Sequence, residues 1–338
     1  MNITAIVRSH IAAISCLLLL CASASAQLVP ERTYYGVERP IPMSIMAPEG
    51  LDGEVKLTLF TADGEVFADA AAEVGDIDLN TLFPELAFEE SPPELLYAQL
   101  SVGDTKVGPP VVLQPMLSVR YATQVVRTPR GDRQPNFPPA SPRTQRFSGI
   151  RAYVEKHVVF ETTKGDMTFK LRPDEAPNTA FNFRHLVESG YYTDILFHRI
   201  IGPKPDKAGF VIQVGDPTGR GDGGPGYFVD LEPSTLPHAY GVLSMARTND
   251  VNTNGGQVFV CLSREGTSFL DGLYTSFGEA IGGGDAIDAI ASVRTTGDPA
   301  NRPVDESEPR IVRAYLVDAD SFGEGAEPLS KQRDAVTR

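Results

Sequence analysis

Short apolar runs separated by glycine-rich connections dominate the second half of this 338-residue chain. They are rich in β-branched and aromatic side chains, which is typical of strands, and each is too short for an ordinary helix. The runs cover residues 157–163, 167–171, 195–201, 209–214, 241–246, 256–262, 274–278 and 311–317. Only two segments with helical signals interrupt the series. This half of the chain is therefore expected to form a closed β-barrel with helical caps.

The first of these helices should begin near Pro177, because proline suits a first helical turn, and should end at Gly190. Its apolar face is expected to carry Ala180, Phe183, Leu186 and Val187. The second should begin at Asp285, a residue type that commonly caps helix N-termini.

Residues 1–26 have the pattern of a secretory signal peptide. Arg8 precedes an apolar run from Ile11 to Cys21, and Ala24-Ser25-Ala26 follows as a small-residue cleavage site. The run is shorter than the roughly 20 residues that span a bilayer. A lipoprotein attached through Cys21 is the less favoured alternative, because Leu20 is bulky. We expect export through the signal peptide, most simply to the periplasm, with the culture medium as the other destination.

The net charge of −14 argues against nonspecific nucleic-acid binding. The charge is uneven: residues 27–123 are strongly acidic, whereas 124–149 hold five arginines, one Asp and several prolines. The latter segment is interpreted as a linker. Docking of its arginines onto an acidic neighbour or an anionic envelope surface remains an alternative.

Residues 27–123 are expected to form a small all-β, sandwich-like accessory domain. Alternation over 54–61, followed by turn chemistry at Asp63-Gly64, predicts a hairpin. A second hairpin is predicted for 95–102 and 107–113, with a polar loop between the two hairpins. Because this region has no His and no Cys, an adaptor or spacer role is favoured. Downstream of residue 26, Cys261 is the only cysteine, and its apolar flanks favour a buried small side chain over a nucleophile.

Five motifs in the second half resemble the cyclophilin family in content and in order. They are Phe197–Ile201, Gly209–Asp216, Gly241–Ala246, Asn252–Phe259 and Phe269–Gly272, the last followed by Phe277-Gly278. The resemblance covers residues 157–318, about half of the chain. It implies an eight-stranded antiparallel β-barrel capped by two helices, and cis/trans isomerisation of X–Pro peptide bonds in proline-containing polypeptides.

The chemistry implied by the resemblance requires only the twisting of an amide, against a barrier of about 18–20 kcal/mol. An arginine that hydrogen-bonds the proline carbonyl and faces the prolyl nitrogen favours the twisted state, and Arg199 matches the family position. The substrate-binding residues carried over are Phe210, Val211, Gln213, Ala246, Arg247, Gln257, Phe259, Phe269, Leu270 and Tyr274. No cofactor and no metal site is expected.

The chain departs from the family pattern at several positions. An insertion at 203–208 lies between Arg199 and Phe210, and we expect it at the rim of the pocket. Phe269 and Tyr274 replace the Trp and His of eukaryotic members, and the lost indole donor predicts weak cyclosporin binding. His198 is expected to be a structural or pocket-wall residue rather than a base. A glycine pattern at 219–224 is rejected as a nucleotide site, because Pro225 follows where a helix should open.

The sequence therefore predicts a mainly β, exported, bacterial-type peptidyl-prolyl isomerase. Its segments are a signal peptide (1–26), the all-β domain (27–123), a Pro/Arg-rich linker (124–149), the isomerase domain (150–320) and a disordered tail (321–338). No nucleic-acid partner and no transmembrane segment are expected, and the accessory domain is expected to have a partner in the cell envelope. The alternative function is a non-catalytic, Pro-peptide-binding scaffold or holdase.

Overall fold

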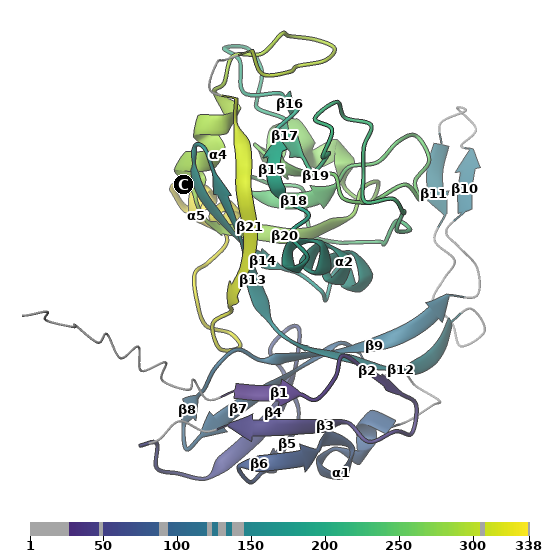
Figure 1. The fold of residues 1–338 in the computed structure, drawn as a ribbon, viewed down its shortest axis with the longest axis vertical. Coiled ribbons are helices and arrows are strands. Elements are labelled where there is room, and N and C mark those ends of the chain that lie inside the picture. Colours follow the sequence, from purple (N-terminus) through teal and green to yellow (C-terminus); the bar gives the residue numbers. More distant parts are fainter. Residues whose placement is uncertain are drawn as a thin grey trace, which may run out of the picture.

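The computed structural model describes residues 27–46, 50–87, 94–119, 124–127, 133–136, 145–304 and 308–336. The predicted signal peptide and half of the predicted linker lie outside these residues. Figure 1 shows two β-rich lobes, one above the other, with the C-terminal segment descending to their junction before it turns back.

The N-terminal lobe contains two antiparallel sheets. One has the strand order β1-β3-β6, and the other has the order β2-β12-β9-β7-β4-β5, with β8 beside β7. Their strands are β1 (Gln27–Pro30), β2 (Tyr34–Gly36), β3 (Pro42–Met46), β4 (Val55–Thr61), β5 (Val66–Ala71), β6 (Gly75–Asp78), β7 (Leu96–Val102), β8 (Thr105–Lys106), β9 (Val111–Val119) and β12 (Gln145–Val154).

Alternation explains how the two sheets share one core. Leu57 and Leu59 of β4 are fully buried, and they belong to the same apolar cluster as Leu28 of β1 and Ile45 of β3. The predicted pairing of β4 with β5 is confirmed. The second predicted hairpin is also present, as β7 pairs with both β8 and β9. The lobe is thus a mainly β unit with a core of its own.

The region between these hairpins is more structured than the predicted polar loop. It contains β6, α1 (Leu79–Leu82) and the 3-10 turn η1 (Pro84–Ala87). The carboxylate of Asp78 accepts hydrogen bonds from the backbone N–H groups of Asn80 (3.1 Å) and Ile41 (2.8 Å). This cap fixes a short helix whose one buried residue, Leu79, gives too weak a periodic signal to be recognised.

The predicted boundaries around residue 150 are wrong, because β12 is a strand of the N-terminal sheet. It pairs with β2 and β9, and it buries Ile150 and Ala152 in the core of that lobe. A bulge at Gly149 hides the alternation. A Cβ at this glycine would lie 1.9 Å from the Tyr35 carbonyl oxygen, so no other residue fits there. Upstream, the predicted linker contains a hairpin of β10 (Gln124–Arg127) and β11 (Arg133–Asn136).

The upper lobe contains a nine-stranded antiparallel sheet in the order β15-β21-β13-β14-β20-β18-β19-β17-β16. Its two end strands, β15 and β16, are separated along the chain only by Phe197 and His198, so the sheet curls round until its ends meet. The strands are β13 (Lys156–Thr162), β14 (Gly165–Leu171), β15 (Thr193–Leu196), β16 (Arg199–Ile200), β17 (Val211–Val214), β18 (Val242–Met245), β19 (Val258–Cys261), β20 (Ser276–Gly282) and β21 (Arg310–Asp318).

Helices α2, α4 and α5 (Leu329–Val336) pack against this sheet. α2 (Pro177–Glu188) buries Ala180, Phe183, Leu186 and Val187, which confirms the predicted face. α4 (Gly284–Ala291) has Gly283 rather than Asp285 at its N-cap. Gly283 has φ +87°, and a Cβ there would lie 2.2 Å from the Asp166 carbonyl oxygen. A glycine is required at this close approach, and Asp285 lies inside the first turn instead.

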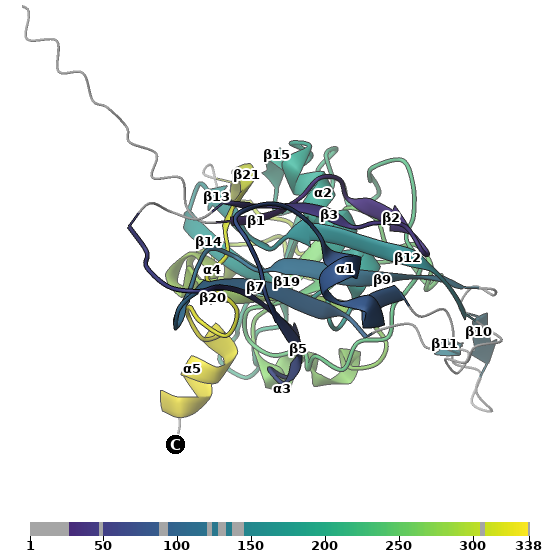
Figure 2. The same ribbon diagram turned by 90° about the horizontal axis from the view of Figure 1, so that it is seen from below.

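The C-terminal segment is ordered over 321–336, so the prediction of a disordered tail is wrong for these residues. Phe322 stacks on Phe60 at 4.8 Å and contacts Tyr97 at 5.0 Å, both in the N-terminal lobe. Its backbone N–H donates to Oε1 of Gln99 (2.8 Å). Beyond it, α5 (Leu329–Val336) lies at the edge of the molecule (Figure 2). The segment therefore connects the two lobes through the Phe322 ring and through hydrogen bonds from Ser321 and Phe322 to the N-terminal lobe.

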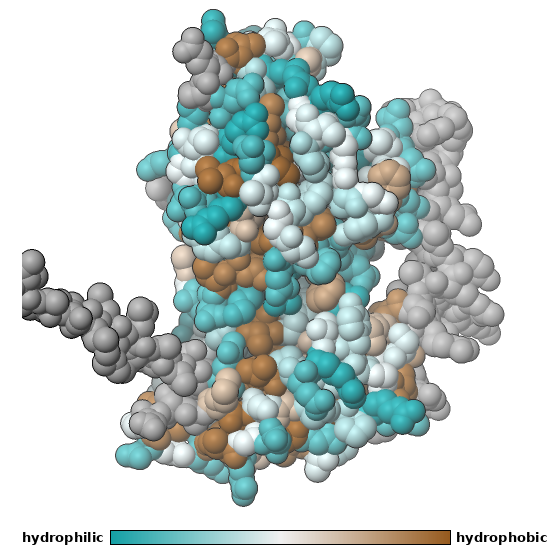
Figure 3. Space-filling model, in the orientation of Figure 1, coloured by the Kyte–Doolittle hydropathy of each residue, from teal (hydrophilic) through white to brown (hydrophobic). Residues whose placement is uncertain are grey.

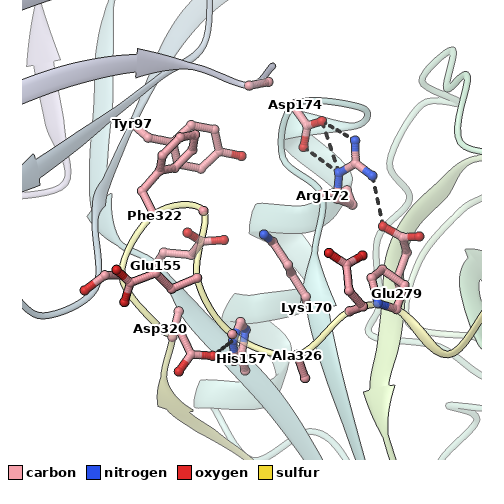
Figure 4. A pocket seen from close by; sticks show the side chains of 18 of the residues that line it. Tyr97, Glu155, His157, Lys170, Arg172, Asp174, Glu279, Asp320, Phe322 and Ala326 are labelled. Atoms are coloured by element: carbon pink, nitrogen blue, oxygen red, sulfur yellow. Dashed lines mark hydrogen bonds and ion pairs between the residues drawn. The ribbon is translucent and has the colours of Figure 1, made fainter. Parts of the chain in front are cut away.

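A polar cavity of about 290 Å³ lies at this junction (Figure 4). Glu155, the one residue between β12 and β13, lines it and is buried, which raises the pKa of its carboxyl to about 7. Its Oε1 has no hydrogen-bond partner within the described parts of the chain. Arg172 is by contrast paired with Asp174 at 2.6 Å and Glu279 at 2.9 Å.

The face of the molecule shown in Figure 3 mixes hydrophilic surface with separate apolar patches. Among the helices of the described residues, none combines the length and the apolar character that crossing a bilayer requires.

Candidate active site

Strand alternation on β17 and β19 creates two faces with different roles. Ile212 and Val214 of β17 point into the core of the upper lobe. Val211 and Phe259 point to the opposite side, because β17 and β19 are antiparallel neighbours in register. There they form a second apolar cluster, separate from that core, and this cluster is the base of the candidate site.

The structure gathers most of the predicted apolar pocket in this second cluster. Val211, Phe259 and Leu270 are buried, and Phe210, Ala246 and Tyr274 pack partly buried around them. The rings of Phe259 and Tyr274 meet edge to face, with centroids 5.9 Å apart. Residues from β17, β19 and two loops therefore converge on one apolar surface.

Arg199 lies beside this surface on β16, opposite Gln213 of β17 in the sheet register. Its Nη1 donates to Oε1 of Gln213 (3.2 Å), and its Cζ lies 6.0 Å from the centre of the Phe210 ring. The side chain is half-buried. A permanent positive charge thus lies at the edge of an apolar pocket, where it is only partly screened by water.

Gln213 and Gln257 continue the polar contacts away from Arg199. Nε2 of Gln213 donates to Oε1 of Gln257 (3.0 Å), and Nε2 of Gln257 donates to the carbonyl oxygens of Gly221 (3.0 Å) and Gly223 (2.9 Å). The two amides and the guanidinium thereby fix one another's orientation.

Phe269 is the exposed member of the predicted set. It is 63% exposed, and its ring stacks on Phe210 at 5.6 Å with an interplanar angle of 16°. Arg247 has its guanidinium 4.2 Å from the centre of the Tyr274 ring and donates to the carbonyl oxygens of Thr248 and Leu273. Its charge is therefore engaged in holding the Tyr274 loop. The structure brings all eleven predicted site residues to one face of the sheet.

A cavity of about 160 Å³ adjoins the polar side of this site. Gln213, Ala246 and Gln257 form one wall, and the glycine-rich loop at 221–224 forms the other. The site thus has an apolar pocket and a neighbouring hollow lined by amides and backbone, which suits an extended polypeptide.

Comparison with known proteins agrees with this arrangement. The family described as "Cyclophilin type peptidyl-prolyl cis-trans isomerase/CLD" matches residues 157–315. The chain is 39% identical over 166 residues to the "Peptidyl-prolyl cis-trans isomerase-like 1" of Aspergillus fumigatus, covering 48% of this chain and 95% of that protein. The chain belongs to the cyclophilin-type peptidyl-prolyl cis-trans isomerases. It is an isomerase, with proline-containing polypeptides as its substrate class.

This cyclophilin is also similar to a bacterial protein and to a protein of known structure. The "Peptidyl-prolyl cis-trans isomerase" of Synechococcus elongatus is 41% identical over 121 residues, covering 36% of this chain and 77% of that protein. A crystal structure of a cyclophilin type peptidyl-prolyl cis-trans isomerase from Cryptosporidium parvum is 34% identical. It covers 48% of this chain and 98% of that chain, with a TM-score of 0.42.

Sequence reasoning missed a buried histidine that supports the cyclophilin pocket from below. His238 is fully buried, and its ring stacks under Phe259 at 6.1 Å. Its Nδ1 donates to Oδ1 of Asp271 (3.0 Å), and its Nε2 lies 2.9 Å from Oγ of Ser244. Burial lowers the pKa of His238, so the ring is neutral at pH 7. A lone histidine in a loop gave no signal for this role.

Asp271 lies in the motif Phe269–Gly272, but the sequence predicts no role for it. Burial tends to raise the pKa of its carboxyl. Hydrogen bonds from Arg264 and from the backbone and ring of His238 outweigh this and lower the pKa to about 2. Asp271 directly follows Phe269 and Leu270, so the ionised carboxylate anchors the loop that forms one wall of the pocket.

Asp216 has a similar role on the other side. It is fully buried, and it accepts hydrogen bonds from the backbone N–H groups of Thr218 (2.7 Å) and Asp222 (3.0 Å). These and other backbone donors overcome the effect of burial and lower its pKa to about 2. Asp216 therefore shapes the loop whose carbonyl groups hold Gln257.

His198 is buried one residue before Arg199, and burial lowers its pKa. Neither ring nitrogen has a hydrogen-bond partner among the residues that the structure describes. No carboxylate there orients the ring as a base. Cys261 is free and buried in the pocket cluster, which confirms its predicted packing role, and burial raises the pKa of its thiol far above neutrality.

Proposed function

We propose that Arg199 and the apolar cluster beside it catalyse rotation about X–Pro bonds in extended polypeptide clients. The proline ring occupies the surface formed by Phe210, Val211, Phe259, Leu270 and Tyr274. The observation that carries the proposal is the half-buried guanidinium of Arg199 at the edge of this surface. We propose that the curled sheet is the family's eight-stranded barrel, with β15 and β16 taken as one interrupted strand.

The chemistry follows from the amide itself. Twisting an X–Pro bond removes the resonance of the C–N bond, so the lone pair that was shared with the carbonyl becomes localised on the prolyl nitrogen. Arg199 donates to the prolyl carbonyl and faces that nitrogen, so its charge stabilises the twisted state more than either planar state. A charge-assisted hydrogen bond contributes about 1.5–3 kcal/mol, which corresponds to roughly 10- to 150-fold in rate.

The pocket supplies the remaining acceleration. Apolar side chains hold the ring fixed and exclude water, so the group preceding proline rotates against a stationary ring. Gln213 and Gln257 contact the backbone of the preceding residues across the adjoining hollow. No acid, base or nucleophile takes part, and this agrees with the buried, neutral state of the nearby histidines.

The direct experiment measures cis/trans exchange of a short proline peptide by NMR with the full chain from Gln27. Uncatalysed exchange takes tens to hundreds of seconds. Exchange that is much faster than this in the presence of the protein supports the proposal. Tight binding of the peptide without acceleration would favour the alternative of a Pro-peptide-binding scaffold.

We also propose that the protein is exported and bacterial, with a signal peptide at 1–26 and clients in the periplasm. The motif from Arg8 to Ala26 supports export, and Phe269 and Tyr274, which replace the Trp and His of eukaryotic members, support a bacterial source. The N-terminal lobe then serves as an adaptor toward an envelope partner. Expression with the native N-terminus in a Gram-negative host, fractionation and mass determination provide the test. Cytoplasmic protein that retains residues 1–26 would contradict the proposal.

A further inference from the structure

The insertion between Arg199 and Phe210 builds a cavity of its own. The cavity has a volume of about 470 Å³ and lies between the loop at 202–208 and the loop that carries Phe269. The insertion follows β16, which lies toward the end of the upper lobe that points away from the N-terminal lobe (Figure 1). The volume of the cavity falls in the range of ordinary ligand pockets.

The walls of this cavity are held in place by backbone contacts. Lys204 and Lys207 exchange backbone hydrogen bonds of 2.9 and 3.1 Å, which close the inserted loop as a tight turn. Gly202 lets the loop lie against α4, since a Cβ there would be 2.0 Å from the Ala291 carbonyl oxygen. A third loop, which follows α4, also lines the cavity through Asp298, and Asp298 accepts a hydrogen bond from Asn301 (2.7 Å). The cavity is therefore built into the fold.

The lining of the cavity combines an apolar part with exposed charged side chains of both signs. Ile201, Ala208 and the stacked rings of Phe210 and Phe269 form the apolar part. Two lysines and three carboxylates, Lys204, Lys207, Asp206, Glu265 and Asp298, form the charged part. A lining of mixed charge does not select a charged group, whereas stacked aromatic walls favour an apolar or aromatic side chain.

The position of the cavity relative to Arg199 determines which part of a client reaches it. Phe210 belongs both to the proline pocket and to the wall of this cavity. The proposed function places the prolyl carbonyl on Arg199, whose Cζ lies 6.0 Å from the Phe210 ring. Because that carbonyl leads to the C-terminal side of proline, the following residues leave the pocket past Phe210.

We propose that this cavity is a specificity subsite for an apolar or aromatic side chain at one of the two residues that follow proline. The inference rests on the proposed function for the direction of the client, and it adds a preference that this chain's own insertion creates. A client with a bulky apolar residue there is bound more tightly at the pocket, and its X–Pro bond is turned over more efficiently.

The test compares three peptides, Ala-Ala-Pro-Ala-Ala, Ala-Ala-Pro-Phe-Ala and Ala-Ala-Pro-Ala-Phe, with the full chain from Gln27. We expect kcat/KM about tenfold higher for one of the Phe peptides than for the all-Ala peptide, as burial of an aromatic side chain predicts. Ala208→Phe fills the cavity and should reduce this ratio below about twofold without changing kcat/KM for the all-Ala peptide. Ala208→Leu serves if the larger side chain prevents folding.

The matched control is Ala300→Phe, which places the same side chain at an exposed position on the neighbouring loop. It should retain the wild-type ratio. Equal kcat/KM for all three peptides with the wild type would overturn the subsite while leaving the isomerase intact. Absence of acceleration for every peptide would instead refute the proposed function. In that case, Kd values measured by calorimetry would test the subsite separately. Equal Kd values of the wild type and of Ala208→Phe for the Phe peptides would refute it.

Discussion

His238 and Asp271 are joined twice, because both the backbone N–H (2.9 Å) and the ring Nδ1 (3.0 Å) of His238 contact the same carboxylate oxygen. Arg264 holds the other oxygen at 2.6 Å. The pair connects the base of the proline pocket to the loop that carries Phe269 and Leu270. The neutral, buried imidazole of His238 thus has a structural role: it links the pocket base to this loop.

Asp271→Asn should weaken the link between His238 and the loop that carries Phe269 and Leu270. The amide cannot maintain the ion pair with Arg264, so we expect a loss of about 1 kcal/mol of folding free energy, allowing for the partial exposure of the carboxylate. We also expect a severalfold rise in KM for a proline peptide. Denaturant titration and peptide kinetics measure both effects. Asp69→Asn, which removes an exposed ion pair in the N-terminal lobe, is the control and should change neither.

The pH profile of kcat/KM should be nearly flat between about pH 6 and 9. Arg199 remains charged throughout this range, and burial lowers the pKa of His198 and of His238, which favours the neutral imidazole in both. Peptide kinetics in constant-ionic-strength buffers provide the measurement. A limb near pH 6.5 that disappears in a folded His198 variant would show that His198 takes part in the reaction.

Glu155 makes stability depend on pH near neutrality. Its folded-state pKa of about 7 lies above the ordinary value of 4.5, because burial favours the neutral acid. The resulting stabilisation is complete below about pH 4.5 and is lost as pH rises through 7. Glu155→Gln should therefore be more stable than the wild type at pH 8, by up to about 3 kcal/mol, and similar at pH 4.5.

The control for Glu155 is Glu54→Gln, an exposed position in the same lobe. Its unfolding free energy should follow the wild type at both pH values. A constant difference between Glu155→Gln and the wild type from pH 4.5 to 8 would mean that the junction carboxyl has an ordinary pKa.

The sequence predicted the parts of the fold that depend on local alternation. The inward face of α2 and the pairing of β4 with β5 follow from the spacing of their own residues. The site residues were found because the five motifs occur in the family's order, and alternation alone would not have separated Phe259 from an ordinary core residue.

Long-range pairing explains what the sequence did not reveal. His238 meets Asp271 across 33 positions, and neither residue carries a local pattern. Phe322 is a single apolar residue in a polar stretch, so its docking on Phe60 was invisible. The bulge at Gly149 broke the alternation of β12 and displaced the predicted domain boundary. The insertion was noted at the pocket rim, but its cavity depends on loops from three parts of the chain.

Phe322→Ala should weaken the connection between the lobes. Removing a ring that contacts Phe60 and Tyr97 costs about 2–3 kcal/mol. We expect the N-terminal lobe to unfold earlier in thermal denaturation, with isomerase activity retained below that transition. Phe67→Ala, at an exposed position on β5, is the control and should leave the melting curve unchanged. A loss of activity in Phe322→Ala at low temperature would show that this connection also shapes the active site.

Replacement of Arg199 tests the central claim most directly. Arg199→Ala is compared with Arg313→Ala, which removes an exposed arginine on β21, and both folds are verified by circular dichroism. The account predicts that Arg199→Ala lowers kcat/KM for X–Pro isomerisation by about 10- to 150-fold, whereas Arg313→Ala changes it by less than about twofold. A folded Arg199→Ala variant that isomerises the peptide at the wild-type rate would contradict the account.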